Sequence, residues 1–163
     1  MSKSETPQRV IVTAGGSGIG RAIVDRFVAS GALVHTCDVQ PEFLDAVVGS
    51  SDSVSGTLAD VGKPKDVETL VAEAVEAMGG VDVLVNNAGI GGPRAALEDV
   101  SYEDWDRTIG VNLNGMFYCI KNVAPHMKAQ QSGCIVNIST ASAKVALPMR
   151  SPYVASKVGV LGL

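Results

Sequence analysis

The sequence has few of the residues that build disulfide scaffolds or metal sites: three cysteines and two histidines. Cys37, Cys119 and Cys134 are odd in number, lie far apart and form no C-x-x-C pair, which argues against both a disulfide framework and a zinc site. His35 and His126 have no partner at metal-ligand spacing. We therefore expect small, buried, reduced thiols, structural histidines, no bound metal and a cytoplasmic location.

Long apolar runs and an excess of positive charge are also missing. No stretch approaches the roughly 20 apolar residues that cross a bilayer, so we expect no membrane span. The net charge of -4 argues against a sequence-independent grip on nucleic acid. The sequence does have 46% hydrophobic and 18% charged residues, which is typical of a globular domain with a well-filled core.

Short apolar runs alternate with amphipathic stretches along the chain, which predicts parallel strands joined by crossover helices. We expect one α/β domain over residues 1–163, with a Rossmann-type, doubly wound parallel sheet of five strands in the order 3-2-1-4-5. The expected strands are residues 9–13, 32–37, 53–58, 81–85 and 134–139. The expected helices are residues 18–30, 41–48, 63–78, about 101–130 with a bend around 110–115, and from 152 onward.

A glycine-rich turn, T-A-G-G-S-G-I-G, follows the first expected strand directly. Glycines let the backbone approach a pyrophosphate closely, and the N-terminus of the next helix offers free N–H groups and positive polarity to the phosphates. An ordinary turn can have the same composition, so the flanking strand and helix carry the prediction. We expect a dinucleotide to be held here by Gly15, Ser17, Gly18, Ile19 and Gly20.

An acidic residue, Asp38, follows the second expected strand. A carboxylate at this place can accept hydrogen bonds from both adenosine ribose hydroxyls, and it repels a 2′-phosphate. No Arg or Lys lies in the glycine-rich turn, and none follows Asp38 closely. These features predict NAD rather than NADP as the cofactor; a solvated Asp at a strand end is the ordinary alternative.

The segment Asn86-Asn87-Ala88-Gly89 ends the fourth expected strand, which neighbours the first strand in the predicted sheet. Asn side chains at such a place can tie strand ends together through backbone hydrogen bonds. Gly89 would leave space beside a cofactor. The plain alternative is an Asn/Gly turn.

A tyrosine and a lysine, Tyr153 and Lys157, lie four residues apart in the last expected helix and so share one helix face. A phenol keeps its proton near neutrality, and a neighbouring ammonium stabilises the phenolate. The pair is therefore suited to moving one proton in acid–base catalysis. By spacing alone it could equally be an ordinary surface pair.

Taken together and in this order, the glycine-rich turn, N-N-A-G and Y-V-A-S-K resemble the motifs of the short-chain dehydrogenase/reductase family over essentially the whole chain. The resemblance implies that Tyr153 takes or gives the substrate proton and that Lys157 also holds the nicotinamide ribose. It further implies cofactor contacts on the adenosine side and beside the fourth strand, made by Asp60, Val61, Asn87, Ala88 and Gly89.

Two positions depart from the family pattern. Ala14 stands where the family usually has its first glycine. The Ser that holds the substrate oxygen falls, by its usual interval from Tyr153, on Thr140, which keeps the hydroxyl and adds a methyl group. Ser142 is the alternative for this role.

Asn112 matches the helix Asn of the family's N-S-Y-K tetrad, where it bends the helix and its carbonyl holds a water that leads to the lysine.

The resemblance implies reversible hydride transfer between a nicotinamide cofactor and a small secondary alcohol or ketone, by a homodimer or homotetramer. Because the sequence stops at Gly162-Leu163 inside an apolar helical pattern, we expect the domain to be truncated before its substrate-covering region. The alternative is an inactive dinucleotide-binding fragment. The glycine spacing argues against a third possibility, a sugar-nucleotide epimerase or dehydratase. Residues 91–93 and 147–150 would face the substrate, but they do not identify it.

Overall fold

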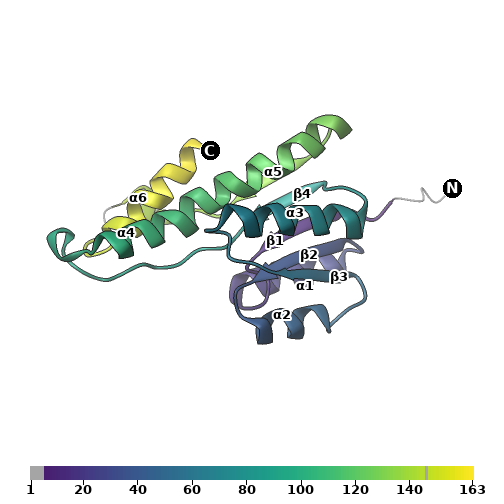
Figure 1. Cartoon of the computed structure of the whole chain (residues 1–163), viewed down its shortest axis with the longest axis horizontal. Helices are drawn as coiled ribbons and strands as arrows, with labels where there is room; N and C mark the ends of the chain where they lie inside the picture. The colour runs from purple at the N-terminus through teal and green to yellow at the C-terminus, as the bar shows by residue number, and fades with distance from the viewer. Residues whose placement is uncertain (1–5, 146) are drawn as a thin grey trace.

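The computed structural model describes residues 6–145 and 147–163, and its centre is a five-stranded parallel sheet in the order β3-β2-β1-β4-β5 (Figure 1). The expected fold class and strand order are therefore confirmed. The strands are β1 Arg9–Thr13, β2 Leu33–Asp38, β3 Val54–Leu58, β4 Val83–Asn86 and β5 Cys134–Asn137.

Helices cover both faces of the sheet, with α1 and α2 on one face and α3 and α5 on the other, while α6 packs against α4 (Figure 1). The α-helices are α1 Gly18–Ala29, α2 Pro41–Val48, α3 Pro64–Met78, α4 Tyr102–Ile109, α5 Gly115–Gln130 and α6 Ser151–Gly159. Short helical turns complete the chain at η1 Leu97–Asp99, η2 Gly110–Asn114, η3 Ala141–Ala143 and η4 Val160–Gly162.

Two apolar cores form because successive side chains of a strand point to opposite faces of the sheet. Val10 and Val12 of β1 join the core under α1 and α2, whereas Ile11 between them joins the core under α3 and α5. All three side chains are fully buried, and burial of each contributes roughly 1.5–3 kcal/mol. These cores hold the carboxyl ends of β1 and β4 side by side.

The long helical stretch begins where expected, because the Ser101 hydroxyl accepts a hydrogen bond from the backbone N–H of Asp104 at 3.1 Å. Where a bend was expected, around residues 110–115, the structure has a π-helical turn, Gly110–Asn114, between α4 and α5. A π turn inserts an extra residue into the helical ladder and changes which side chains face inward.

The expectation of three buried thiols is wrong for Cys134. Cys37 and Cys119 are buried, and burial raises the pKa of each thiol, that of Cys37 to about 12. Cys134 is exposed because β5 pairs with β4 along one edge only and has no covering helix among the described residues. Its neighbours Ile135 and Val136 are also 37% and 40% exposed. Among the helices that the structure describes, none combines the length and apolarity that crossing a bilayer requires.

Candidate active site

Two adjoining cavities lie at the carboxyl ends of the strands, the location expected for a ligand in a doubly wound sheet. The large cavity has a volume of about 540 Å³ and the small pocket about 100 Å³, and Gly89 and Ile90 line both. The large cavity is lined by Ile19, Asn87, Gly89, Ile90, Gly91, Ile138, Ser139, Thr140, Leu147, Arg150, Tyr153 and Lys157. The small pocket is lined by Ala14, Cys37, Asp38, Val39, Ala59, Asp60, Val61, Ala88, Gly89, Ile90, Arg107 and Val111.

The glycine-rich turn ends at the start of α1, beside these cavities. The first backbone N–H to donate within the helix is that of Arg21, to the carbonyl of Ser17 at 3.0 Å, so the N–H groups of residues 18–20 precede the ladder. Gly18 has a φ of 53° and open space where a side chain would stand. The Ser17 hydroxyl makes no capping bond. Three free N–H groups, a helix N-terminus and open space suit a pyrophosphate.

The end of β4 is tied to the glycine-rich turn by Asn87, as expected for the N-N-A-G segment. Its Nδ2 donates to the carbonyls of Thr13 and Ala14 at 3.0 and 3.2 Å, and the Thr13 hydroxyl accepts from the backbone N–H groups of Asn87 and Ala88 at 3.0 Å. Ala14 has a φ of 54°, a left-handed conformation that costs a residue with a Cβ atom about 1 kcal/mol. The hydrogen bond to its carbonyl helps to hold this conformation.

Asp38 forms one wall of the small pocket at the end of β2. Its two carboxylate oxygens accept hydrogen bonds from the backbone N–H groups of Gly16 at 3.2 Å and Gln40 at 3.0 Å. Each carboxylate oxygen has a second lone pair, so these bonds fix the orientation of the carboxylate and leave acceptor capacity for a ribose hydroxyl.

Asp60, across the small pocket, is held by Arg107 of α4, a residue that the motif analysis did not identify. One carboxylate oxygen of Asp60 accepts from Arg107 Nη1 at 2.8 Å, and the other accepts from the backbone N–H of Gly62 at 2.9 Å. No sequence motif marks Arg107, which lies one helical turn before Val111, another residue that lines the same pocket.

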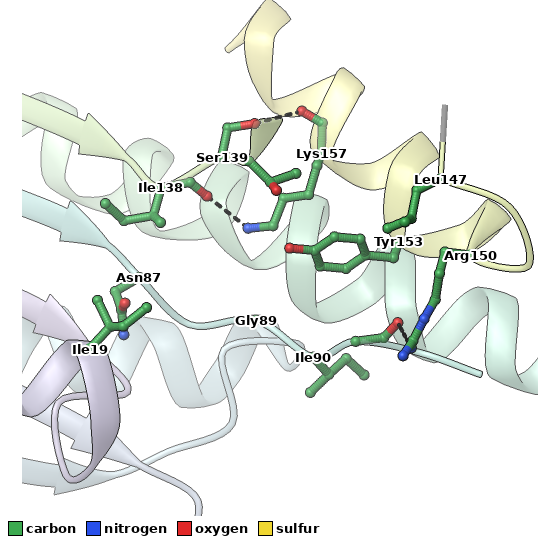
Figure 2. Close-up of a pocket in the computed structure, with 12 residues that line it drawn as sticks. Ile19, Asn87, Gly89, Ile90, Ile138, Ser139, Leu147, Arg150, Tyr153 and Lys157 are labelled. Atoms are coloured by element: carbon green, nitrogen blue, oxygen red, sulfur yellow. Dashed lines mark hydrogen bonds between the residues drawn. The ribbon is translucent and has the colours of Figure 1, made fainter. Parts of the chain in front are cut away.

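Tyr153 and Lys157 both line the large cavity, and Figure 2 shows the phenol and the lysine side chain pointing into it from α6. Lys157 is 4% exposed, and its ammonium donates to the carbonyl of Ile138 at 2.7 Å. Burial lowers the pKa of Lys157. The Ser139 hydroxyl donates to the Lys157 carbonyl at 3.0 Å, which fastens α6 to the end of β5.

Of the two candidates for holding the substrate oxygen, the structure brings Thr140 to the large cavity and not Ser142. The Thr140 hydroxyl oxygen accepts from the backbone N–H of Ser142 at 3.3 Å, which caps the η3 turn and keeps its own proton available to donate. Strand β5 ends at Asn137, two residues before the expected end at 139, so Thr140 lies beyond the strand.

Asn112 lies behind the cavity wall and does not line it. The side chain is 0% exposed, which excludes a solvent-facing role. Its Oδ1 accepts from the backbone N–H of Ile90 at 2.7 Å, and its Nδ2 donates to the Ile90 carbonyl at 2.9 Å and to Ser156 Oγ at 3.0 Å. Asn112 thus joins the segment after β4 to the helix that carries Tyr153.

The predicted cofactor residues divide between the two cavities and the turn beside them. Ile19 and Asn87 reach the large cavity, Asp38, Asp60, Val61 and Ala88 reach the small pocket, and Gly89 reaches both. Those that line neither are Gly15, Ser17, Gly18 and Gly20. Within residues 6–145 and 147–163, no three His, Cys, Asp or Glu side chains gather to hold a metal ion.

Comparison with known proteins gives a consistent picture. The family profile described as short chain dehydrogenase matches residues 8–163. Over 156 residues the chain is 39% identical to the 2,5-dichloro-2,5-cyclohexadiene-1,4-diol dehydrogenase of Sphingobium indicum, covering 94% of this chain and 62% of that protein. Over 160 residues it is 41% identical to the 2-(R)-hydroxypropyl-CoM dehydrogenase of Xanthobacter autotrophicus, covering 94% of this chain and 64% of that protein.

The crystal structure of levodione reductase has a similar fold, with a TM-score of 0.90 and 35% identity over 95% of this chain and 62% of that one. The chain therefore spans less than two thirds of the length of each of these three proteins. The named substrates of the two dehydrogenases differ widely in chemistry, so similarity alone identifies no substrate for this chain.

Proposed function

This chain belongs to the short-chain dehydrogenase family, and from that membership we propose that it serves reversible hydride transfer between a nicotinamide cofactor and a secondary alcohol or ketone. The observation that carries the proposal is the convergence of Tyr153, Lys157 and Thr140 on one cavity beside the glycine-rich turn. Family membership implies a nicotinamide cofactor, NAD or NADP.

The shape of the site supports a dinucleotide. We assign the adenosine half to the small pocket beside Asp38 and Asp60, and the nicotinamide half to the large cavity beside Tyr153. The start of α1 lies beside both and offers free N–H groups to the pyrophosphate. A bound nicotinamide would supply or accept the hydride at its C4 atom.

The residues of the chain would manage one proton and hold the substrate. In the direction of oxidation, the phenol oxygen of Tyr153 takes the hydroxyl proton, and in the direction of reduction it returns a proton to the carbonyl oxygen. The Thr140 hydroxyl donates a hydrogen bond to the same substrate oxygen. Lys157 brings a positive charge to the wall of the same cavity, and the bond from its Nζ to the Ile138 carbonyl fixes where that charge lies.

NAD is the cofactor we propose, because Asp38 presents a carboxylate where a 2′-phosphate would be repelled. Arg107 also lines the small pocket, but its guanidinium is paired with Asp60 and so is less available to neutralise a 2′-phosphate. For the whole protein we also propose a homodimer or homotetramer. A cytoplasmic location is supported by the three free cysteines among the described residues.

A second candidate function is dinucleotide binding without turnover by the 163-residue chain. The chain spans less than two thirds of the length of the relatives that share its motifs. Binding would then require the turn and the small pocket, and Tyr153 would transfer no proton.

Substituting Tyr153 by Phe tests the leading proposal, since the ring stays and the proton-carrying oxygen goes. We expect NADH binding, followed by fluorescence, to be retained, while turnover of secondary alcohols falls about 100-fold or more. Tyr102→Phe is the matched control, because Tyr102 is 91% exposed at the start of α4 and lines neither cavity. Normal turnover by Tyr153→Phe would remove Tyr153 from the mechanism. NADH binding without turnover by the unsubstituted chain would favour the second candidate.

A further inference from the structure

A second cation, Arg150, lines the large cavity in addition to Lys157. It is half-buried at the residue that precedes α6, three positions before Tyr153. Figure 2 shows its side chain beside Tyr153, extending toward the segment that follows Gly89. Proton transfer by Tyr153, Lys157 and Thr140 makes no use of this guanidinium.

The guanidinium of Arg150 is held in place by two backbone carbonyls. Its Nη1 donates to the carbonyl oxygens of Gly91 and Gly92, each at 3.1 Å. These bonds use the two N–H groups of Nη1. Of the five N–H donors of an arginine, the three on Nη2 and Nε have no acceptor among the residues that the structure describes. That Nη2–Nε edge is one that pairs with a carboxylate through two parallel bonds.

The positive charges that line the large cavity have no acidic side chain beside them among the described lining residues. Arg150 and Lys157 are its charged lining residues, and no Asp or Glu lines it within residues 6–145 and 147–163. None of the ion pairs in the described part of the chain includes Arg150. The chain as a whole carries a net charge of -4, so the cavity is a local positive region on an acidic protein. A concave site lined by one sign of charge concentrates ligands of the opposite sign.

We propose that Arg150 binds a carboxylate of the substrate, so that the substrate is a hydroxy acid or the corresponding oxo acid. The carboxylate pairs with the Nη2–Nε edge of Arg150, and the hydroxyl or carbonyl carbon is then presented to Tyr153 and Thr140. This inference rests on the proposed function, because it assigns the substrate class of the same cavity. The Gly91 and Gly92 carbonyls are positioning groups that fix the fork before the substrate arrives.

The test compares matched substrates that differ only in having a carboxylate or its neutral amide: lactate with lactamide, and β-hydroxybutyrate with β-hydroxybutyramide. In the NAD-saturated protein we expect the ratio of kcat/KM for acid over amide to fall at least about tenfold in Arg150→Met, the loss of one charge-assisted hydrogen-bonded pair. Arg150→Lys keeps the charge without the fork, and we expect an intermediate ratio. Arg94→Met is the control, because Arg94 is exposed on the segment that contains Gly91 and Gly92 and does not line the cavity.

A purely structural role for Arg150 gives a different result. If the residue only ties Gly91 and Gly92 to α6, its substitution lowers turnover of acid and amide in parallel and leaves their ratio unchanged. That outcome would overturn the inference and leave the proposed hydride transfer intact.

A binding measurement separates the two proposals where turnover is too slow to measure. In ¹⁵N-labelled protein with saturating NADH, we expect the Nε–H resonance of Arg150, assigned with Arg150→Lys, to shift saturably with β-hydroxybutyrate and not with its amide. No shift with either acid overturns the inference. A saturable shift in a protein that turns over no secondary alcohol would support the carboxylate site and contradict the proposed function.

Discussion

Asp38 tests the choice of cofactor at the scale of one residue. Asp38→Asn keeps the shape of the side chain and removes the charge that repels a 2′-phosphate. We expect the ratio of the NADPH to the NADH dissociation constant, measured by fluorescence titration, to fall about tenfold, which corresponds to about 1.4 kcal/mol. Asp45→Asn, an exposed position on α2, is the matched control. An unchanged ratio would mean that the Asp38 carboxylate does not face the ribose.

Single residues were predictable from the sequence where a motif fixes both their type and their order. The positions of Tyr153, Lys157 and Asn87 follow from short segments whose spacing matches one helix turn or one strand end. Arg107 was not predictable in this way, because it reaches Asp60 from a helix 47 residues further along the chain. Thr140 and Ser142 could be separated only once the end of β5 was known.

At the scale of elements, a buried polar network joins β2, β3 and α3. His35 Nδ1 lies 2.8 Å from Ser55 Oγ, His35 Nε2 lies 2.9 Å from Thr57 Oγ1, and the Thr57 hydroxyl donates to Glu73. Burial lowers the pKa of His35 from 6.5 to about 4, although the charge of Glu73 opposes this shift. The imidazole is therefore neutral in the folded protein at pH 7.

The lowered pKa of His35 makes the stability of this sheet pH-dependent. The unfolded chain takes up the proton first as the pH falls below about 6.5, so the free energy of unfolding decreases from there to about pH 4, by up to about 3 kcal/mol for this group. Urea unfolding at pH 7.5 and pH 5 measures it. We expect His35→Gln to lose less stability between these two pH values than the unsubstituted protein, whereas the control His126→Gln behaves as the parent does. Equal losses in all three proteins would contradict the prediction.

The elements themselves were largely predictable, because buried runs and helical periodicity repeat along the sequence. The differences lie at element ends, where tertiary contacts decide. Strand β4 begins at Val83 and not at 81, and β5 stops where Thr140 caps the following turn. An irregularity in the long helix was expected, but not its form as a π turn, within which Asn112 bonds across to Ile90.

At the scale of the whole molecule, β5 is an edge strand with exposed apolar side chains. Unpaired strand edges of this kind template association between chains, and a charge placed on the edge opposes it. We expect the 163-residue chain to form larger species as its concentration rises, and Ile135→Lys to reduce them, as measured by sedimentation velocity. Leu97→Lys, at another exposed apolar position, is the control. A monomer at every concentration would contradict this prediction.

Ala14 is among the residues that line the pocket we assign to adenosine, and its backbone is in a left-handed conformation. A glycine there would adopt the same backbone conformation without strain and would remove one apolar carbon from a residue that lines the pocket. The alanine at this position therefore costs the fold some stability, and under the proposed assignment the added carbon would lie near the adenosine half of the cofactor.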